Sequence, residues 1–273
     1  MIVITGATGN VGARLVSILA AAGEQVTAVS RRAPAAGLPD GVRHVAADLD
    51  DPASLKPALE EADALFLLVA GDDPQGILDV AKGAGLRRIV LLSSQGAGTR
   101  PEAYGHPRAF EDAVRGSDLD WTILRPGGFD SNAFAWAETV RTERMVAAPF
   151  GDVGLPTVDP DDIAEVAAAV LVQEEHAGRT YELTGPASTT PRERTQAIGD
   201  ALGAAVRFVE QTRAEARAQM LQFMPEPVVE GTLAILGEPM PAEQRVSPHI
   251  EQVLGRPPRT FADWATRNIA AFR

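Results

Sequence analysis

Residues 1–19 read MIVITGATGNVGARLVSIL, and this stretch decides the fold. It begins with a short apolar run, residues 2–4, which ends abruptly at Thr5. Further along, apolar residues recur with the spacing of one helix face, at Val11, Leu15, Ile18 and Leu19. An unbroken apolar run is typical of a strand buried on both faces, whereas the later spacing is typical of a helix. The stretch therefore predicts a buried strand, a tight turn and a helix.

The turn carries three glycines in the pattern G-x-x-G-x-x-G, namely Gly6, Gly9 and Gly12. A glycine has no Cβ, so a ligand can approach its main chain, and the free N–H groups at a helix start attract an anion. In this context the pattern predicts a site for the pyrophosphate of a dinucleotide, beside Thr8, Asn10 and Val11. The alternative is a turn whose glycines only pack the helix against the strand.

The composition limits the classes of protein that fit. The chain has 273 residues, 45% of them hydrophobic, which is enough for a large α/β core. Its net charge of −12 opposes binding to nucleic acid or to an anionic membrane. It has no cysteine, its longest apolar run, residues 64–70, is too short to span a bilayer, and no leader precedes the first strand. We therefore expect a cytoplasmic protein without disulfides.

The second predicted strand, residues 25–30, is followed by Arg31 and Arg32. In a doubly wound sheet this position faces the adenosine ribose of the cofactor, where an acidic residue suits NAD and an arginine suits the 2′-phosphate of NADP. The two arginines therefore predict NADP(H). The alternative is a solvated basic loop ahead of a turn at residues 34–39.

Strands and helices alternate through the first 126 residues. The six predicted strands are residues 2–4, 25–30, 42–46, 64–69, 88–92 and 121–124. This alternation is typical of a right-handed, doubly wound parallel sheet. Helices are predicted at residues 55–62, 74–83, 107–116 and 134–140, with residues 95–106 as a loop, and a capping box at Thr190 and Glu193 begins another.

Three segments resemble the NmrA-like branch of the atypical short-chain dehydrogenase/reductases. They are TGATGNVG at residues 5–12, DWTILRPG at residues 120–127 and RTFADWA at residues 259–265. The resemblance covers nearly the whole chain. It implies an NADP-binding Rossmann core over residues 1–155, to which a helix at 161–173 and a strand at 180–184 return. It also implies a smaller, mostly helical lobe over residues 185–273, with residues 129–145 contributing, that closes over the nicotinamide.

The resemblance also implies further contacts to the cofactor. Asp48 is expected near the adenine amino group and Leu49 against the ring, although Asp48 can also be only a turn residue. The other expected contacts follow the later strands: Val69, Ala70, Ser93, Pro126, Gly127 and Phe129.

The usual catalytic triad of this superfamily is Ser with Y-x-x-x-K, in which the lysine lowers the pKa of the tyrosine. The chain has only Tyr104 and Tyr181, and neither has a lysine four residues later. In the register that the family pattern suggests, the tyrosine position falls on Ala103 and the lysine position on Pro107. The standard triad is therefore absent.

Three interpretations of the chemistry remain open. Tyr104 can still reach the site, His106 can donate the proton, or the acceptor needs no positioned acid because it accepts hydride readily. Ser94 is the third candidate catalytic residue, although Ser93 and Ser94 can simply end a strand. His106 can equally be a solvated loop residue.

The candidate substrate residues are Gln95, Asn132, Trp136 and Phe223. Apolar side chains such as Trp136 and Phe223 can equally belong to a core. We expect an NADPH-dependent reductase of a small or flat carbonyl, quinone or conjugated acceptor, monomeric or homodimeric and without a metal. One alternative is a non-catalytic NADP(H) sensor that binds a protein partner. The other is a ketoreductase of secondary, polyketide metabolism.

Overall fold

The computed structural model describes residues 1–33 and 37–273, so part of the turn expected at residues 34–39 lies outside the described residues. The chain divides into two compact units. The first comprises Met1–Pro126, Pro160–Leu183 and Gln252–Gly255, and the second Gly127–Asp159, Thr184–Glu251 and Arg256–Arg273. The first break thus falls at Gly127 and not near residue 155. Residues 128–130 belong with the second unit because they pair with Val158 in a short parallel bridge.

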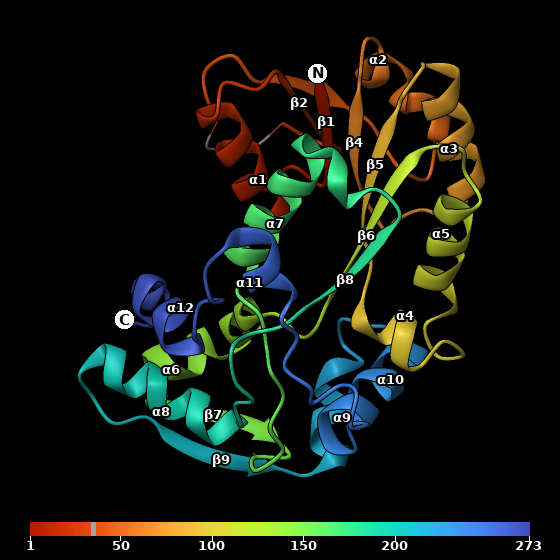
Figure 1. Ribbon diagram of the computed structural model, residues 1–273. Coiled ribbons are helices and arrows are strands. Elements are labelled where there is room, and N and C mark those ends of the chain that lie inside the picture. The colour runs from red at the N-terminus through yellow and green to blue at the C-terminus, as the bar shows by residue number, and fades with distance from the viewer. Residues whose placement is uncertain (34–36) are drawn as a thin grey trace. The chain divides into compact units, whose positions relative to one another are not determined.

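The first unit contains a seven-stranded sheet in the order β3-β2-β1-β4-β5-β6-β8 (Figure 1). Its strands are β1 (Ile2–Thr5), β2 (Val26–Ser30), β3 (Arg43–Ala46), β4 (Ala64–Leu68), β5 (Arg88–Leu92), β6 (Asp120–Pro126) and β8 (Arg179–Leu183). All neighbouring strands run parallel. The strand order reverses direction between β1 and β4, which is the topology of a Rossmann fold. The predicted fold class is confirmed.

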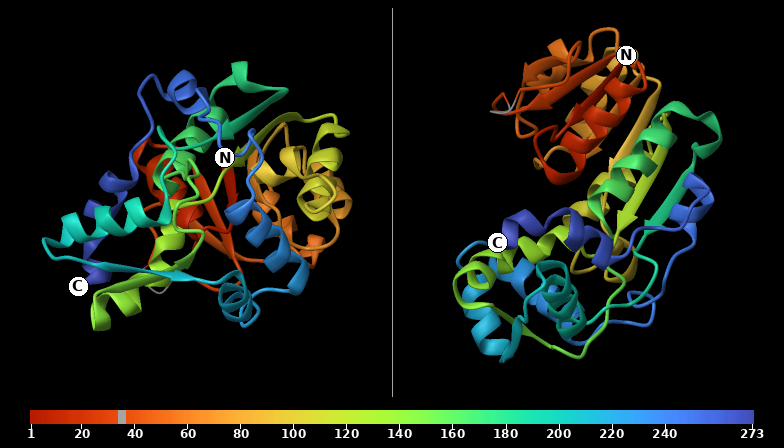
Figure 2. Two further views of the ribbon diagram at one scale, coloured as in Figure 1. Left: turned by 90° about the horizontal axis from the view of Figure 1, so that it is seen from below. Right: turned by 90° about the vertical axis from the view of Figure 1, so that its left-hand side faces the viewer.

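Helices cover both faces of this sheet (Figures 1 and 2). One face carries α1 (Asn10–Ala21) and α7 (Pro160–Val172), which pack against each other. The other face carries α2 (Lys56–Leu59), α3 (Pro74–Gly83) and α5 (Gly105–Arg115), and a large apolar core lies beneath them. The 3-10 turns η1 (Pro52–Leu55) and η3 (Glu174–His176) complete the unit with α4 (Gln95–Thr99). Both faces are therefore shielded, as the apolar strands require.

Two helices of the first unit differ from the sequence-based predictions. The helix expected at residues 55–62 ends at Leu59, because Glu60 is extended and Glu61 has a φ of 62°. Residues 95–106 are not one loop, because Ser94 caps a short helix, α4, by accepting a hydrogen bond from the Gly96 amide at 3.2 Å. Glycine-rich segments have low helix propensity, so the sequence of α4 does not predict it.

The second unit is mostly helical but contains a small sheet. Strands β7 (Met145–Pro149) and β9 (Arg207–Gln211) pair in parallel, and neither was predicted. The other elements are η2 (Asp130–Trp136), α6 (Ala137–Glu143), α8 (Pro191–Leu202), α9 (Arg213–Met220), α10 (Glu226–Gly237), α12 (Phe261–Arg267) and η4 (Ile269–Phe272). Helix α11 (His249–Leu254) is divided between the two units after Glu251. The capping box at Thr190 is confirmed, whereas the helix expected at residues 134–140 begins as a 3-10 turn.

The second unit has its own apolar core. Trp264 lies at its centre and contacts Phe134, with ring centroids 5.0 Å apart, and Phe261, at 5.4 Å. Buried residues of α6, β7 and α8, among them Val140 and Val146, complete this core. Aromatic rings therefore anchor α12 to the rest of the unit. Among the described residues, no helix is long and apolar enough to cross a bilayer.

Candidate functional site

Gly6 and Gly12 are required by the fold itself. Gly6 has a φ of 62°, and a Cβ added to it would lie 2.1 Å from Cδ1 of Leu68. A Cβ added to Gly12 would lie 2.2 Å from the carbonyl oxygen of Gly6. Helix α1 therefore begins directly on the backbone of the turn, at a separation that only glycine allows. The interpretation of the turn as a packing device is correct for these two residues.

Gly9 is different, because no side chain crowds it. It is the N-cap of α1, with a φ of −85° that other residues adopt, and an added Cβ would meet only the Gly6 carbonyl oxygen, at 3.3 Å. Thr8, Gly9 and Asn10 are exposed, whereas the side chain of Val11 is buried. The first turn of α1 carries no acidic residue. The start of α1 is therefore an open cradle of main-chain N–H groups, which fits the pyrophosphate of a dinucleotide.

The end of β2 presents two arginines. Arg31 and Arg32 are both exposed, and neither forms an ion pair with another residue of the described part of the chain. The backbone beside them is fixed, because the Ser30 hydroxyl donates to the Arg32 carbonyl oxygen at 2.7 Å and contacts Nε2 of His44 at 3.0 Å. The arrangement thus leaves two guanidinium groups on an anchored turn, as a 2′-phosphate site requires.

Asp48 forms a turn at the end of β3. Its Oδ1 accepts from the Asp50 amide at 3.2 Å, and the Ser54 hydroxyl donates to its main-chain oxygen at 2.9 Å. Gly71, which follows Ala70, has a φ of 79°, and a Cβ there would lie 2.3 Å from the Leu49 carbonyl oxygen. The segments after β3 and β4 are therefore in contact, and Gly71 is needed for that contact. The sequence showed the glycine but not its partner.

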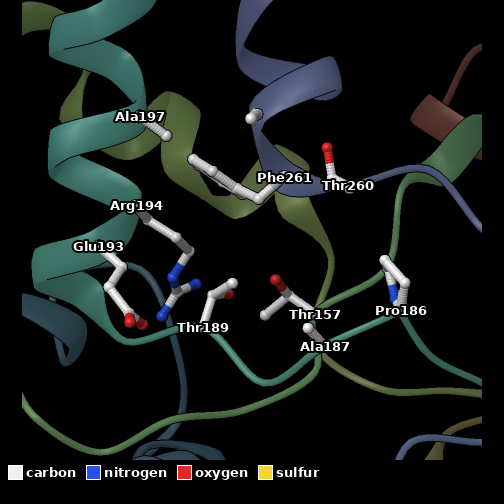
Figure 3. A pocket seen from close by; sticks show the side chains of 10 residues that line it. Thr157, Pro186, Ala187, Thr189, Glu193, Arg194, Ala197, Thr260 and Phe261 are labelled. Carbon is white, nitrogen blue, oxygen red and sulfur yellow. The ribbon is translucent and has the colours of Figure 1, made fainter.

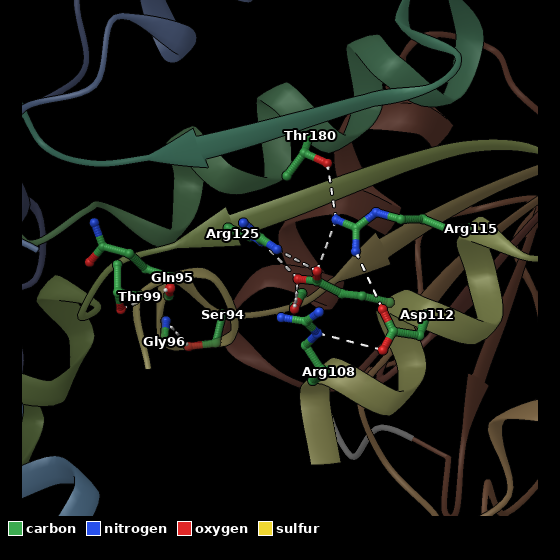
Figure 4. Close-up of polar contacts among 11 residues, drawn as sticks. Ser94, Gln95, Gly96, Thr99, Arg108, Asp112, Arg115, Arg125 and Thr180 are labelled. Carbon is green, nitrogen blue, oxygen red and sulfur yellow. Dashed lines mark hydrogen bonds and ion pairs between the residues drawn. The ribbon is translucent and has the colours of Figure 1, made fainter. Parts of the chain in front are cut away.

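A buried carboxylate lies at the ends of β5 and β6. Glu111 is fully buried, and Arg125 donates to it through Nε at 2.8 Å and Nη2 at 2.6 Å. The Ser93 hydroxyl donates to Oε1 at 2.6 Å, and Arg115 lies 3.0 Å from Oε2. Figure 4 shows Arg115 and Arg125 entering this network from different elements. Burial alone would raise the pKa of Glu111, but the hydrogen bonds from Arg125 and Ser93 outweigh burial and lower it.

The two serines predicted for the site both have local partners. The Ser93 hydroxyl donates a hydrogen bond to Glu111, and the Ser94 hydroxyl caps α4. Gln95 follows on α4 with its side chain buried. Each hydroxyl keeps further hydrogen-bonding capacity, because a serine can both donate and accept. Their roles toward cofactor and substrate stay predictions, whereas the Glu111 network was not predicted.

Tyr104 and His106 lie at the start of α5. The Tyr104 ring lies so close to Gly96 of α4 that a Cβ there would be 2.5 Å from the ring. His106 packs edge-on against Phe110 and holds the Gly71 carbonyl oxygen at 2.7 Å; because a carbonyl only accepts, Nε2 carries the proton. Arg108, four residues after Tyr104, pairs with Asp112 at 3.5 Å. The basic residue four positions after Tyr104 thus has an acidic partner of its own on α5.

Pro126 ends β6 in the first unit, whereas Gly127 and Phe129 lie in the second. Of the predicted substrate residues, Gln95 belongs to the first unit and the other three to the second. Asn132 is exposed on η2, and Trp136 is half-buried and packs against the core around Trp264. Phe223 is 80% exposed between α9 and α10. The apolar stripe therefore divides: Trp136 contributes to a core, and Phe223 does not.

The fold and the glycine turn define a nucleotide-binding Rossmann protein. A family described as NAD(P)H-binding matches residues 6–174. The chain belongs to this family and binds NAD(P)H.

Full-length relatives extend this result. The chain is 36% identical to (4-alkanoyl-5-oxo-2,5-dihydrofuran-3-yl)methyl phosphate reductase of Streptomyces griseus, covering 100% of this chain and 99% of the relative. It is 30% identical to the NAD(P)H azoreductase of Xenophilus azovorans, again over 100% and 99%. The chain is accordingly an NAD(P)H-dependent oxidoreductase that acts as a reductase.

Solved structures agree on the fold. The NADPH complex of a quinone oxidoreductase from Escherichia coli matches with a TM-score of 0.82 at 24% identity, covering 98% of this chain and 99% of that one. NmrA, a negative transcriptional regulator in complex with NADP, matches with a TM-score of 0.77 at 19% identity, over 98% and 95%. The expected NmrA-like fold is confirmed.

Gly9 allows the cradle to be tested apart from the fold. We expect Gly9→Val to weaken NADPH binding by at least about 100-fold, because the side chain would occupy the cradle, with a change in unfolding free energy of about 1 kcal/mol or less. Gly12→Ala should instead lower the urea midpoint of unfolding, because its Cβ would collide with Gly6. Fluorescence titration and urea denaturation measure both effects. Unchanged NADPH affinity in Gly9→Val would contradict the cradle.

The Glu111 network makes stability depend on pH. Because the folded-state pKa of Glu111 is lowered, its contribution is present above the ordinary value of 4.5 and is lost as the pH falls through the lowered value. Glu111→Gln should lower the free energy of unfolding at pH 7 by about 3–5 kcal/mol, because Arg125 loses its charged partner. The exposed Glu60→Gln is the control. Equal acid sensitivity of Glu111→Gln and wild type would refute this assignment.

Proposed function

We propose that the protein transfers hydride from NADPH to a conjugated acceptor without a Ser–Tyr–Lys triad. The observation that carries this proposal is the missing lysine of the triad, because neither Tyr104 nor Tyr181 has a lysine four residues later. The Tyr104 ring packs on Gly96, and the basic residue four positions later, Arg108, pairs with Asp112. Of the two lysines in the sequence, Lys82 pairs with Asp118 at 3.2 Å and Lys56 begins α2. The position four residues after Tyr104 holds Arg108, so the lysine of the usual triad is replaced there.

The names of the relatives support a conjugated acceptor. One describes a phosphorylated dihydrofuranone that carries an alkanoyl group, and the other describes azo compounds. Each class offers a double bond in conjugation with an electron-withdrawing group. When hydride adds to such a bond, the negative charge spreads over the conjugated system, and water can deliver the proton. A positioned acid is then unnecessary, in line with the missing triad.

The residues of the first unit have defined tasks in this proposal. NADPH supplies the hydride when it is bound. The N–H groups around Gly9 hold its pyrophosphate, and Arg31 and Arg32 bind its 2′-phosphate. The remaining proposed cofactor contacts are Gly6, Thr8, Asn10, Val11, Asp48, Leu49, Val69, Ala70, Ser93, Pro126, Gly127 and Phe129.

The proposed acceptor contacts are Gln95, Asn132, Trp136 and Phe223. Tyr104, His106 and Ser94 then orient the acceptor or its water. His106 already donates its Nε2 proton to the Gly71 carbonyl oxygen, so this proton is shared with the backbone. A panel of quinones, azo compounds, conjugated lactones and simple ketones, followed by NADPH absorbance, tests the proposal. Oxidation of NADPH by simple ketones alone would contradict it.

Arg31 and Arg32 should set the preference for NADPH over NADH. Two charge-assisted hydrogen bonds to a phosphate are worth about 2–4 kcal/mol together, or about 30-fold to several hundredfold in affinity. Changing both residues to alanine should remove this preference and leave NADH binding nearly unchanged. The matched control changes two exposed arginines elsewhere, Arg87→Ala and Arg207→Ala. If NADPH and NADH bind equally to the wild type, the assignment is wrong.

The Tyr104→Phe variant tests whether turnover depends on this tyrosine as an acid or base. The chain lacks the lysine that activates the tyrosine of the usual triad, so Tyr104→Phe should lower turnover by less than about tenfold. Loss of a positioned general acid costs about 10²–10⁴-fold. His106→Ala is the paired variant, measured with the same acceptor. A thousandfold loss in Tyr104→Phe with unchanged NADPH binding would make Tyr104 the catalytic acid.

A further inference from the structure

A cavity of about 220 Å³ lies within the second unit, and the proposed function gives it no task. Its lining includes Thr157, Thr189, Arg194 and Phe261. Figure 3 shows the Arg194 side chain extending from α8 toward Thr189, with Thr157 on the neighbouring segment. Polar side chains from three separate segments thus meet at one hollow.

Arg194 is the unusual member of this group. It is 8% exposed, and its guanidinium lies 5.6 Å from the centre of the Trp136 ring and 6.0 Å from that of Phe261. Burial lowers the pKa of Arg194, and attraction to the buried Asp130 opposes this effect. An arginine remains charged in proteins even so. The protein therefore maintains a buried cation beside a cavity.

Three buried polar atoms at this cavity have no hydrogen-bond partner among the described residues. These atoms are Nε of Arg194 and the hydroxyl oxygens of Thr157 and Thr189. Buried donors without partners are rare in folded proteins. The attraction between Arg194 and Asp130 does not supply an acceptor for Nε. Three such donors around one cavity would be satisfied by a ligand whose atoms accept hydrogen bonds.

We propose that this cavity binds the oxyanion of a small organic ligand, a phosphate monoester or a carboxylate. A guanidinium matches an oxyanion in charge and in the geometry of its donors, and threonine hydroxyls add two further donors. Glu193 also lines the cavity, but its carboxylate does not serve as the missing acceptor for these donors. Its side chain is exposed and already accepts from the Thr190 amide at 2.8 Å, as part of the helix cap.

None of the residues that line this cavity is a proposed cofactor contact, and occupation of the cavity does not require turnover. Binding can therefore be measured whether or not a conjugated acceptor is reduced. The two proposals fail independently, because one is read from NADPH oxidation and the other from a binding isotherm.

Calorimetric titration with inorganic phosphate and, separately, with acetate tests the site. Both titrations are made at constant ionic strength against chloride, with saturating NADP⁺, so that the cofactor site is filled. We expect saturable binding of at least one of the two anions. Phosphate alone would indicate a phosphate monoester as the ligand, and acetate alone a carboxylate. Arg194→Gln should weaken binding at least about tenfold, whereas Arg192→Gln, on the exposed side of the same helix, should not.

The proposal is overturned if neither anion binds more tightly than chloride, or if a folded Arg194→Gln variant binds as the wild type does. Circular dichroism reports whether that variant folds. Should it fail to fold, the double variant Thr157→Val, Thr189→Val decides, because it keeps the buried cation and removes only two donors. This variant should bind the anion several-fold more weakly, and unchanged affinity there also overturns the proposal.

Discussion

The contact between Gly12 and the Gly6 carbonyl oxygen is the constraint on which the first unit depends. It lets α1 pack closely on the short turn that follows β1. A single added carbon at Gly12 would lie 2.2 Å from that oxygen. The first free N–H groups of α1 therefore face the carboxyl end of the sheet, where the strand order reverses between β1 and β4. Gly9 is not crowded by side chains, because the close contacts between helix, turn and sheet are made at Gly6 and Gly12.

Residues with strong local signals were predicted from the sequence. The apolar runs of β1, β4 and β5, the glycine turn and the capping box at Thr190 each specify their structure within a few residues. Strands β7 and β9 were missed because they pair across about 60 residues of sequence. Locally, β7 (MVAAP) carries two alanines and a proline, and β9 (RFVEQ) mixes polar and apolar residues. Helix α4 was missed because its glycines oppose helix formation and its stability depends on the Ser94 cap.

In the candidate site, too, residues with a local signal could be named from the sequence and residues that meet only on folding could not. The glycines after β1 and the arginines after β2 could be named as candidates, because each group directly follows a predicted strand. The network around Glu111 could not, because Ser93, Glu111 and Arg125 come from the end of β5, from α5 and from β6 and meet only in the folded chain. The cavity at Arg194 was missed for the same reason: its three polar groups are 32 and 5 residues apart in sequence, and no local pattern links them.

Glu111 and Arg194 show two ways of burying a charge. Glu111 is surrounded by donors on several sides, so it is a permanent part of the framework. Arg194 is held by rings and by attraction to Asp130, while its Nε remains without an acceptor. The first arrangement is complete in the protein alone, and the second is complete only with a guest.

The hydrogen bond from the Ser30 hydroxyl to the Arg32 carbonyl oxygen holds the turn after β2. It uses the main-chain oxygen of Arg32, so the guanidinium groups of Arg31 and Arg32 take no part in it. Side chains at positions 31 and 32 can therefore be exchanged during evolution without rebuilding the sheet edge. With the role proposed for the two arginines, one or two substitutions there would shift the preference between the phosphorylated and the unphosphorylated nicotinamide cofactor.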